Sequence, residues 1–262
     1  MGVEGASKFT YLMCERSHRQ RHVSVCTDFF IHFQAWDFTL DQSKCKLWFE
    51  LRAGRITASN MYRATHSNPL KPSVTLIRDI CYPYERRFEC QAVRYGKRHE
   101  GDGADRYHSH MVQFHQVFKM MPGGFKINRQ YPFYGASPDR LVECLCCGAG
   151  VLEIKCPLTV ADKSIDQWHL DFLELGPTGM SLKREHPYYY QCITQMILCD
   201  VGYCDFVVWG SKAMYLERIY VDPGLWSEIH AKASVFHEIV IWPEILMKHF
   251  TRSKVKKIKS SI

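Results

Sequence analysis

Four short β-like runs near the middle of the chain constrain its fold more than any other feature. Each is rich in aromatic or branched apolar residues, and glycine-containing turns separate them, which is typical of consecutive strands. The runs are residues 125–128, 131–136, 141–144 and 151–156. A later pair of alternating runs, 205–209 and 214–221, is joined by a turn at residues 210–212 and predicts two more strands.

Helical periodicity flanks these strands. Apolar residues recur at three- and four-residue steps between residues 85 and 117, and residues 187–199 also have a helical pattern. A closing helix is predicted from Leu225, and we expect it to bend or stop near Pro243 because proline lacks an amide donor and clashes with the preceding turn. The sequence therefore predicts an α/β fold with a central mixed β-sheet flanked by helices.

The length of the chain and the length of its apolar runs predict its domain organisation and its location. A chain of 262 residues can form one substantial core, so we expect an N-terminal extension (1–45), one domain (46–250) and a basic tail (251–262). No run approaches the roughly 18 apolar residues of a membrane span, and residues 1–17 lack the apolar centre of a signal peptide. We therefore expect an intracellular protein, in the nucleus or cytoplasm and not secreted.

The net charge of +7 favours a polyanionic partner. Five cations between residues 252 and 259 form the predicted basic tail, which would serve as a nuclear-localisation signal, a non-specific DNA contact or a solubilising end.

Glu153 and Lys155 are the centre of the predicted chemistry. Their spacing of two places both side chains on one face of a strand, with Leu152 and Ile154 on the other. An exposed ion pair on a strand would have the same spacing. However, Asp139 lies 14 positions upstream of Glu153, at the start of a run that can form a hairpin with this strand. The hairpin would bring the two carboxylates together.

Two carboxylates near a basic region suit Mg²⁺, with Mn²⁺ as the alternative, because Mg²⁺ binds one or two carboxylates and keeps other positions for water and phosphate. Such an ion polarises a phosphate and lowers the pKa of an attacking water. Lys155 would orient that water or offset negative charge in the transition state.

Several segments of the chain resemble one nuclease family. Residues 135–141 (GASPDRL) and 150–157 (GVLEIKCP) resemble the core of the PD-(D/E)xK superfamily, whose fold is restriction-endonuclease-like, and in particular its lambda-phage exonuclease and YqaJ-type viral recombinase branch. Residues 51–59 (LRAGRITAS), 95–100 (YGKRHE) and 188–196 (YYYQCITQM) are similar to the branch's other motifs, in the family's order.

The resemblance implies a DNA exonuclease that acts on duplex ends, with 5′ to 3′ polarity, in recombination or in viral or mobile-element DNA processing. It implies a role for each matching residue. The metal ligands are Asp139, Glu153, the Ile154 carbonyl and Glu100; the catalytic residues are Lys155, Gln191 and these three carboxylates; the groups that bind a 5′-phosphorylated end are Arg52, Ser59, Ser137 and, beside Gln191 on the helix, Tyr188.

Simpler interpretations remain open for some of these residues. A helical glutamate beside charged neighbours, such as Glu100, is often a surface charge. Arg52 next to an aromatic residue could only pack, and Ser59 could only cap a helix. On the helix, Tyr188, Gln191 and Gln195 share one face, and a polar helix face is usually solvent-facing.

The cysteines pose a separate question. Twelve cysteines without an export signal are best interpreted as reduced thiols. The group Cys144, Cys146, Cys147 and Cys156 has enough thiolates for a tetrahedral metal site. It has no second C-x-x-C element, so a cysteine-rich hairpin without metal is favoured.

Two other functions compete with the exonuclease: an endonuclease or repair nuclease of the same fold, and a non-catalytic DNA-end-binding module of recombination. The complete Asp139, Glu153 and Lys155 set argues against the non-catalytic module. Arg52 with Ser59 and Ser137 favours recognition of an end, because a terminal phosphate offers extra charge and acceptors. The resemblance also implies a homotrimer and a strand-annealing partner protein.

Overall fold

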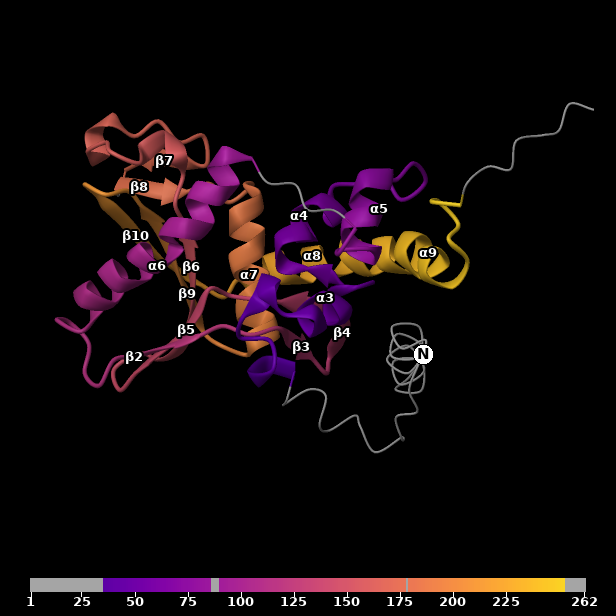
Figure 1. Ribbon diagram of the computed structural model, residues 1–262, viewed down its shortest axis with the longest axis horizontal. Helices are drawn as coiled ribbons and strands as arrows, with labels where there is room; N and C mark the ends of the chain where they lie inside the picture. The colour runs from indigo at the N-terminus through magenta and orange to yellow at the C-terminus, as the bar shows by residue number, and fades with distance from the viewer. Residues whose placement is uncertain (1–34, 86–89, 178, 253–262) are drawn as a thin grey trace, which may run out of the picture.

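A computed structural model describes residues 35–85, 90–177 and 179–252. Two sheets and a hairpin form its β-structure, and helices cover both faces of the larger sheet (Figure 1). The helices are η1 (Gln42–Lys44), α3 (Lys46–Arg52), α4 (Ala58–Thr65), α5 (Val74–Cys81), α6 (Gln91–Met111), η2 (Leu158–Val160), η3 (Ile165–Gln167), α7 (Pro187–Cys199), α8 (Pro223–Phe236), the π-helix η4 (His237–Ile241) and α9 (Trp242–Met247).

The larger sheet has the order β10-β9-β6-β5-β2. Strands β6 and β9 are parallel, and the other neighbours are antiparallel, so the sheet is mixed as predicted. A smaller sheet has the order β1-β4-β3, and β7 pairs with β8. The strands are β1 (Ile56–Thr57), β2 (Lys119–Pro122), β3 (Lys126–Asn128), β4 (Tyr131–Ala136), β5 (Arg140–Cys144), β6 (Gly148–Lys155), β7 (Leu173–Gly176), β8 (Gly179–Leu182), β9 (Tyr203–Trp209) and β10 (Met214–Tyr220).

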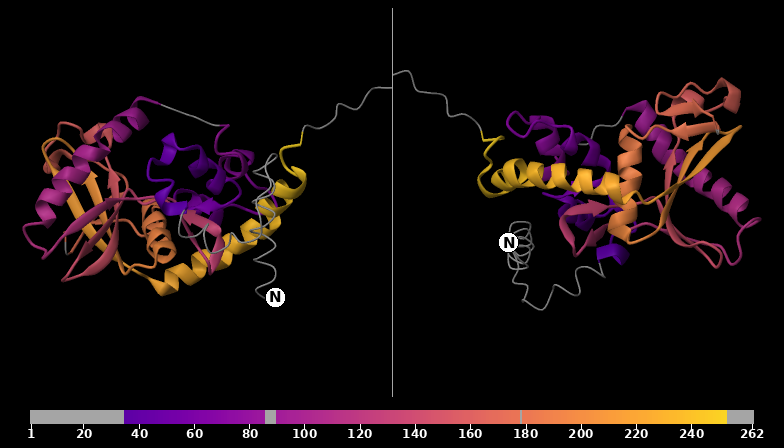
Figure 2. Two further views of the ribbon diagram at one scale, coloured as in Figure 1. Left: turned by 60° about the horizontal axis from the view of Figure 1, so that its bottom comes forward. Right: turned by 180° about the vertical axis from the view of Figure 1, so that it is seen from behind.

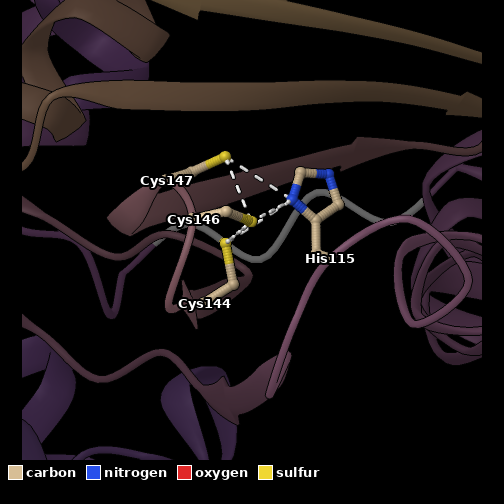
Figure 3. Close-up of side chains that lie close together, drawn as sticks. All are labelled: His115, Cys144, Cys146 and Cys147. Atoms are coloured by element: carbon tan, nitrogen blue, oxygen red, sulfur yellow. Dashed lines mark hydrogen bonds between the residues drawn. The ribbon is translucent and has the colours of Figure 1, made fainter.

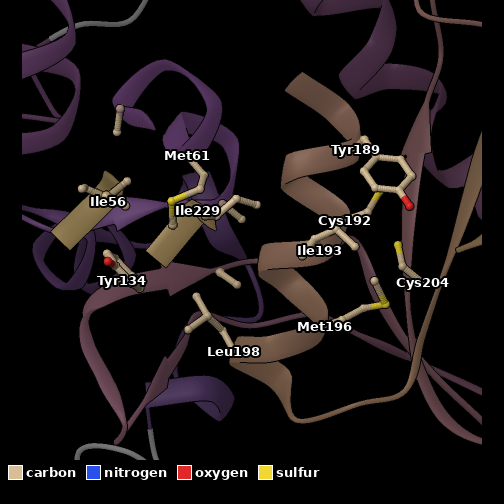
Figure 4. Packing of buried hydrophobic residues seen from close by; sticks show 14 of the residues in the cluster. Ile56, Met61, Tyr134, Tyr189, Cys192, Ile193, Met196, Leu198, Cys204 and Ile229 are labelled. Atoms are coloured by element: carbon tan, nitrogen blue, oxygen red, sulfur yellow. The ribbon is translucent and has the colours of Figure 1, made fainter. Parts of the chain in front are cut away.

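Helix α7 connects the parallel strands β6 and β9 and packs on one face of the sheet. Its side chains Cys192, Ile193 and Met196 are fully buried in the main apolar core, and Cys192 and Met196 lie near Cys204 of β9 (Figure 4). Parallel neighbours require such a crossover, and burial of the apolar side chains of α7 in this core stabilises it.

Helix α6 covers the opposite face, where Leu152 and Ile154 of β6 point. Gly103 permits the close approach, because a Cβ at this position would lie 2.9 Å from the Ile154 side chain. The two faces of β6 therefore differ as the sequence predicts: one packs on α6, and the other carries Glu153 and Lys155 toward α7.

A helix was predicted within residues 85–117, and the structure has one there, α6, but it is shorter than predicted. Helix α6 ends at Met111, and the strand β2 was missed. β2 is an edge strand whose residues are mostly exposed, so it lacks the alternating pattern by which a half-buried strand is identified. The hairpin β7–β8 was missed for the same reason, since most of its residues are exposed or half-buried.

The last helix, expected to bend or stop near Pro243, does not stop there, but its α-helical pattern changes to a π-helix at His237–Ile241, just before this proline. Helices α8, η4 and α9 form one continuous rod, which runs along the smaller sheet in Figure 2. Pro243 lies in the first turn of α9, directly after the wider π-helical turns, where the altered hydrogen-bond pattern accommodates its missing amide. The rod ends at Lys248, which adopts a left-handed conformation with φ 52°.

Residues 35–45 contact the segment just before the predicted site. The Thr39 hydroxyl accepts a hydrogen bond from the Phe125 backbone amide at 2.7 Å, and the side-chain Nε2 of Gln42 donates to the carbonyls of Gly123 (2.9 Å) and Pro138 (3.1 Å). The end of the predicted extension thus packs on the domain. Residues 1–34 lie outside the described residues, as do most of the basic tail.

Candidate functional site

The β5–β6 hairpin brings Asp139 beside Glu153, as the sequence predicts. Arg140 pairs with Leu152 in the register, so Asp139 lies opposite Glu153. The Asp139 backbone amide donates to the Leu152 carbonyl at 3.1 Å, and its Oδ2 accepts from the Ile154 amide at 2.7 Å. Asp139 is therefore fixed at the end of the hairpin by backbone groups of β6.

Glu153 is a buried carboxylate, 2% exposed, and three side chains hold it. Its Oε1 accepts from Lys155 Nζ (2.5 Å) and Gln191 Nε2 (2.7 Å), and its Oε2 accepts from Gln195 Nε2 (2.7 Å). This burial rules out the exposed surface ion pair that the sequence left open. Donors on α7 and β6 together satisfy a charge that would otherwise be costly to bury.

Lys155 lies between Glu153 and the aromatic ring of Tyr188. Its Nζ is 4.3 Å from the ring centroid and 3.4 Å from Gln191 Oε1. Burial alone would lower the pKa of Lys155, but the negative charges of Glu153 and Asp139 outweigh it and raise the pKa. The ammonium therefore stays charged in this arrangement.

For Asp139, burial and the neighbouring carboxylates both disfavour the charged form. Burial raises its pKa well above the usual value, and the charges of Glu153 and Glu100 raise it further. Glu100 on α6 forms an ion pair with Arg140 at 3.1 Å and is about one-third exposed. Together with the buried Asp139, the carboxylates of Glu153 and Glu100 form an oxygen-rich, negative site of the kind that a hard divalent cation stabilises.

A second group lies at the end of β4, next to Asp139. The Arg52 guanidinium stacks on the Trp48 ring at 4.0 Å, and Trp48 Nε1 donates to Ser137 Oγ at 2.8 Å. β1 pairs with β4, and Ser59 follows it at the start of α4, with its hydroxyl 3.2 Å from Thr57 Oγ1. Trp48 thus joins Arg52 to Ser137, and the β1–β4 pairing places the start of α4, with Ser59, beside the end of β4.

Arg52 carries an unsatisfied donor. Among the described residues, its buried Nε has no hydrogen-bond partner. Burial lowers the pKa of Arg52 to about 10. A half-buried arginine whose buried Nε lacks an acceptor is suited to an anionic ligand, which would supply both the charge and the acceptor.

Three residues that contact this site were not predicted from the sequence to belong to it. Gln195 was placed on the polar face of its helix, but it is fully buried and bonded to Glu153. Arg140 pairs with Glu100, and Trp48 contacts both Arg52 and Ser137. The position of Arg140 directly after Asp139 was the only sequence signal for it, whereas the other two depend on packing between distant segments.

Residues 47–201, more than half of the chain, match the model of the YqaJ-like viral recombinase domain. The chain belongs to this family. The matched residues include all the motifs by which the sequence resembles the lambda-phage exonuclease and YqaJ-type branch. No curated protein is significantly similar in sequence to this YqaJ-like chain.

Solved structures with the same fold include alkaline exonucleases. LHK-Exo from Laribacter hongkongensis, in complex with dAMP, has a TM-score of 0.57 and 24% identity over 76% of this chain and 93% of its own. The Shutoff and Exonuclease protein of Kaposi's sarcoma associated herpesvirus has a TM-score of 0.55 and 13% identity over 80% of this chain and 72% of its own. The YqaJ-like chain therefore has the restriction-endonuclease-like fold that was predicted.

No helix within residues 35–85, 90–177 and 179–252 combines the length and the apolar character of a transmembrane span.

Proposed function

We propose that this YqaJ-like protein is a Mg²⁺-dependent DNA exonuclease that hydrolyses phosphodiester bonds from duplex ends in the 5′ to 3′ direction. One observation carries the proposal: a buried Glu153 and a charged Lys155 share one face of β6, and Asp139 is fixed beside them. The family and the fold shared with alkaline exonucleases support the same chemistry.

The residues fit a Mg²⁺ ion. Of the two carboxylate oxygens of Asp139, Oδ2 accepts the hydrogen bond from the Ile154 amide. Oδ1 has no hydrogen-bond partner among the described residues and is left for a ligand. A carboxylate offers about four acceptor positions, and Glu153 uses three of them in hydrogen bonds. Asp139, Glu153, the Ile154 carbonyl and Glu100 would hold the ion, which when bound polarises the phosphate and activates a water.

The protein's own side chains supply the remaining steps. Lys155 stays protonated and offsets the charge that develops on the phosphate oxygens, with its position fixed by the Tyr188 ring and Gln191. Gln191 and Gln195 hold the Glu153 carboxylate in one orientation. Arg52 and Ser137 would bind the 5′-terminal phosphate next to Asp139.

A DNA substrate is supported by the net charge of +7 and by the related viral protein, whose structure includes a complex with DNA. The name of the family supports recombination, or the processing of viral or mobile-element DNA, as the setting. This role would be performed inside the cell, in the nucleus or cytoplasm. The homotrimer and the strand-annealing partner stay predictions, which the native mass of the purified protein and co-purification would test.

A closed DNA circle separates the exonuclease from an endonuclease of the same fold. We expect the protein to degrade linear duplex DNA in the presence of Mg²⁺ and to leave a covalently closed circle intact, because a circle has no end. A label at one 5′ terminus should be released first. Nicking of the circle would favour the endonuclease, and binding of ends without hydrolysis in Mg²⁺ or Mn²⁺ would favour the non-catalytic module.

A further inference from the structure

His115 meets three cysteines at the end of the β5–β6 hairpin that is remote from the catalytic residues. Cys144 ends β5, Cys146 and Cys147 form the turn, and His115 comes from the loop between α6 and β2 (Figure 3). One ligand atom from each of the four lies within 4.8 Å of the others. We propose that these four side chains, the His/Cys cluster, bind one structural Zn²⁺ ion.

The spacing matches the edges of a coordination tetrahedron. Zn–S bonds of about 2.3 Å and Zn–N bonds of about 2.0 Å imply edges of about 3.8 Å between sulfurs and about 3.5 Å between nitrogen and sulfur. His115 Nδ1 lies 3.1 Å from Cys146 Sγ and 3.5 Å from the sulfurs of Cys144 and Cys147. Cys146 Sγ is 3.3 Å from Cys144 Sγ and 3.8 Å from Cys147 Sγ.

The chemistry of the cluster selects zinc. Three thiolates and one imidazole are a known structural zinc set, and soft thiolates favour zinc over Mg²⁺. The sulfurs are too far apart for disulfides, whose bond is about 2.05 Å, and all three cysteines are free. An iron–sulfur cluster binds its cysteines at different irons, which spreads them more widely than a single ion does.

Groups around the cluster suit the negative charge of three thiolates. The backbone amides of Gln116 and Cys147 and the guanidinium of Arg218 lie near the thiols of Cys146, Cys144 and Cys147, respectively, where their positive or partly positive charge would offset that of the thiolates. Outer partners of this type orient metal ligands and balance their charge. Arg218 in turn forms two hydrogen bonds, of 2.8 and 2.9 Å, to the buried Asp205 of β9.

The ion would fasten a segment that little else holds. Near His115 the side chains of Val112, Phe114 and Val117 are exposed, as is Leu145 of the hairpin turn, so the loop buries little apolar surface. A backbone hydrogen bond from Leu145 to Gln116 (3.0 Å) also joins loop and hairpin. Because zinc binding free energy becomes folding free energy, the ion would fasten the loop between α6 and β2 to the turn of the β5–β6 hairpin.

Cys156, which the sequence grouped with these cysteines, does not belong to the cluster. It follows the other end of β6, is buried against α6, and its thiol donates to the His99 carbonyl at 3.4 Å. The favoured interpretation of a hairpin without metal considered only cysteines, and it missed His115. The histidine lies 29 positions before Cys144, and the pairing of β2 with β5 brings the two together.

Zinc content of the full-length protein tests the proposal. Protein expressed with zinc, purified without chelator and dialysed should contain close to one zinc ion per chain. The variants His115→Gln and Cys146→Ser should lose it and melt at lower temperature. The matched variants His110→Gln and Cys90→Ser should keep it, because these residues lie outside the cluster. In the unmutated protein, Co²⁺ substituted for zinc should give the intense visible bands of tetrahedral thiolate coordination. This measurement does not depend on whether a variant folds.

A variant of the catalytic site separates the two metals. Asp139→Asn should keep its zinc although it loses the proposed Mg²⁺ ligand, so failure of the nuclease proposal would leave this result unchanged. Absence of zinc from the unmutated protein, zinc retained in Cys146→Ser, zinc lost from Asp139→Asn, or a disulfide within the cluster would each overturn the proposal.

Discussion

Asp139 and Glu153 are adjacent carboxylates with very different surroundings. Glu153 is satisfied by Lys155, Gln191 and Gln195, whereas the carboxylate of Asp139 accepts, within the described part of the chain, one hydrogen bond, from the Ile154 amide, and its pKa is raised by burial and by its acidic neighbours. A buried charge with few partners is costly to the fold. The arrangement is thus strained electrostatically until a cation compensates it, as expected of a functional site.

We expect Asp139→Asn to abolish Mg²⁺-dependent cleavage and to raise the melting temperature of the metal-free protein. Asparagine still accepts the Ile154 amide hydrogen bond but removes a negative charge that Glu153 and Glu100 disfavour. Lys155→Ala should also inactivate the enzyme, yet leave Mg²⁺ affinity largely unchanged, because an ammonium is not a metal ligand. Calorimetric Mg²⁺ titration and thermal melting measure both effects. Full activity of Asp139→Asn would contradict the assigned site.

Arg52→Ala should remove the preference for 5′-phosphorylated ends. Charge-assisted hydrogen bonds contribute about 1.5 to 3 kcal/mol, so the unmutated enzyme should degrade phosphorylated duplexes roughly ten- to a hundredfold faster than 5′-hydroxyl duplexes. Loss of the stacking on Trp48 is the competing effect, and it predicts a less stable protein with the same end preference. Rates on both substrates, with a melting curve for each protein, decide between them. Equal rates on both ends for the unmutated enzyme would refute the phosphate pocket.

At the scale of elements, helix α7 and the rod α8–η4–α9 fix the site from two sides. Helix α7 carries Gln191 and Gln195 to Glu153, and its apolar side chains fill the core. In the rod, His237 Nε2 donates to the Gly54 carbonyl at 3.2 Å. Gly54 lies two residues after Arg52, so the π-helical segment supports the backbone that follows the proposed phosphate-binding arginine.

The burial of His237 predicts that the stability of the protein depends on pH. Burial lowers the pKa of His237 to about 4; the hydrogen bond to Gly54 opposes this, and the charge of Arg55 adds to it. Because the folded pKa lies below the unfolded value of 6.5, the stabilisation is complete above pH 6.5 and is lost as pH falls toward 4. The loss amounts to roughly 3 kcal/mol.

Denaturant unfolding of His237→Gln should show a flatter stability profile between pH 6.5 and 4 than the unmutated protein. The control is His169→Gln, which changes an exposed histidine and should leave the profile unchanged. Parallel profiles for the His237 variant and the unmutated protein would show that this ring does not titrate on unfolding.

At the scale of the whole molecule, the excess of positive charge and the basic C-terminal tail could both contribute to DNA binding. The described chain ends at Arg252, and residues 253–262, with four more lysines, lie outside the described residues. If the tail contacts DNA, its deletion should reduce the slope of log affinity against log salt by about 0.9 for each lost phosphate contact. Affinity measured across a salt series checks this. An unchanged slope would leave nuclear localisation or solubility as the function of the tail.

The sequence by itself determined the features that depend on local geometry. A strand's period of two places Glu153 with Lys155, and a short hairpin turn brings Asp139 beside them, so these contacts follow from spacing alone. Helix α7 was predicted with its observed bounds because its apolar period and flanking residues are local signals.

Only the tertiary structure decided which distant segments meet. Gln195 is buried because a strand packs over its helix face, Trp48 reaches Ser137 across 89 positions, and His115 completes a group that spacing restricted to cysteines. The physical reason is that periodicity fixes the direction of a side chain relative to its own element. The partner depends on how elements pack, which the energy of the whole core determines.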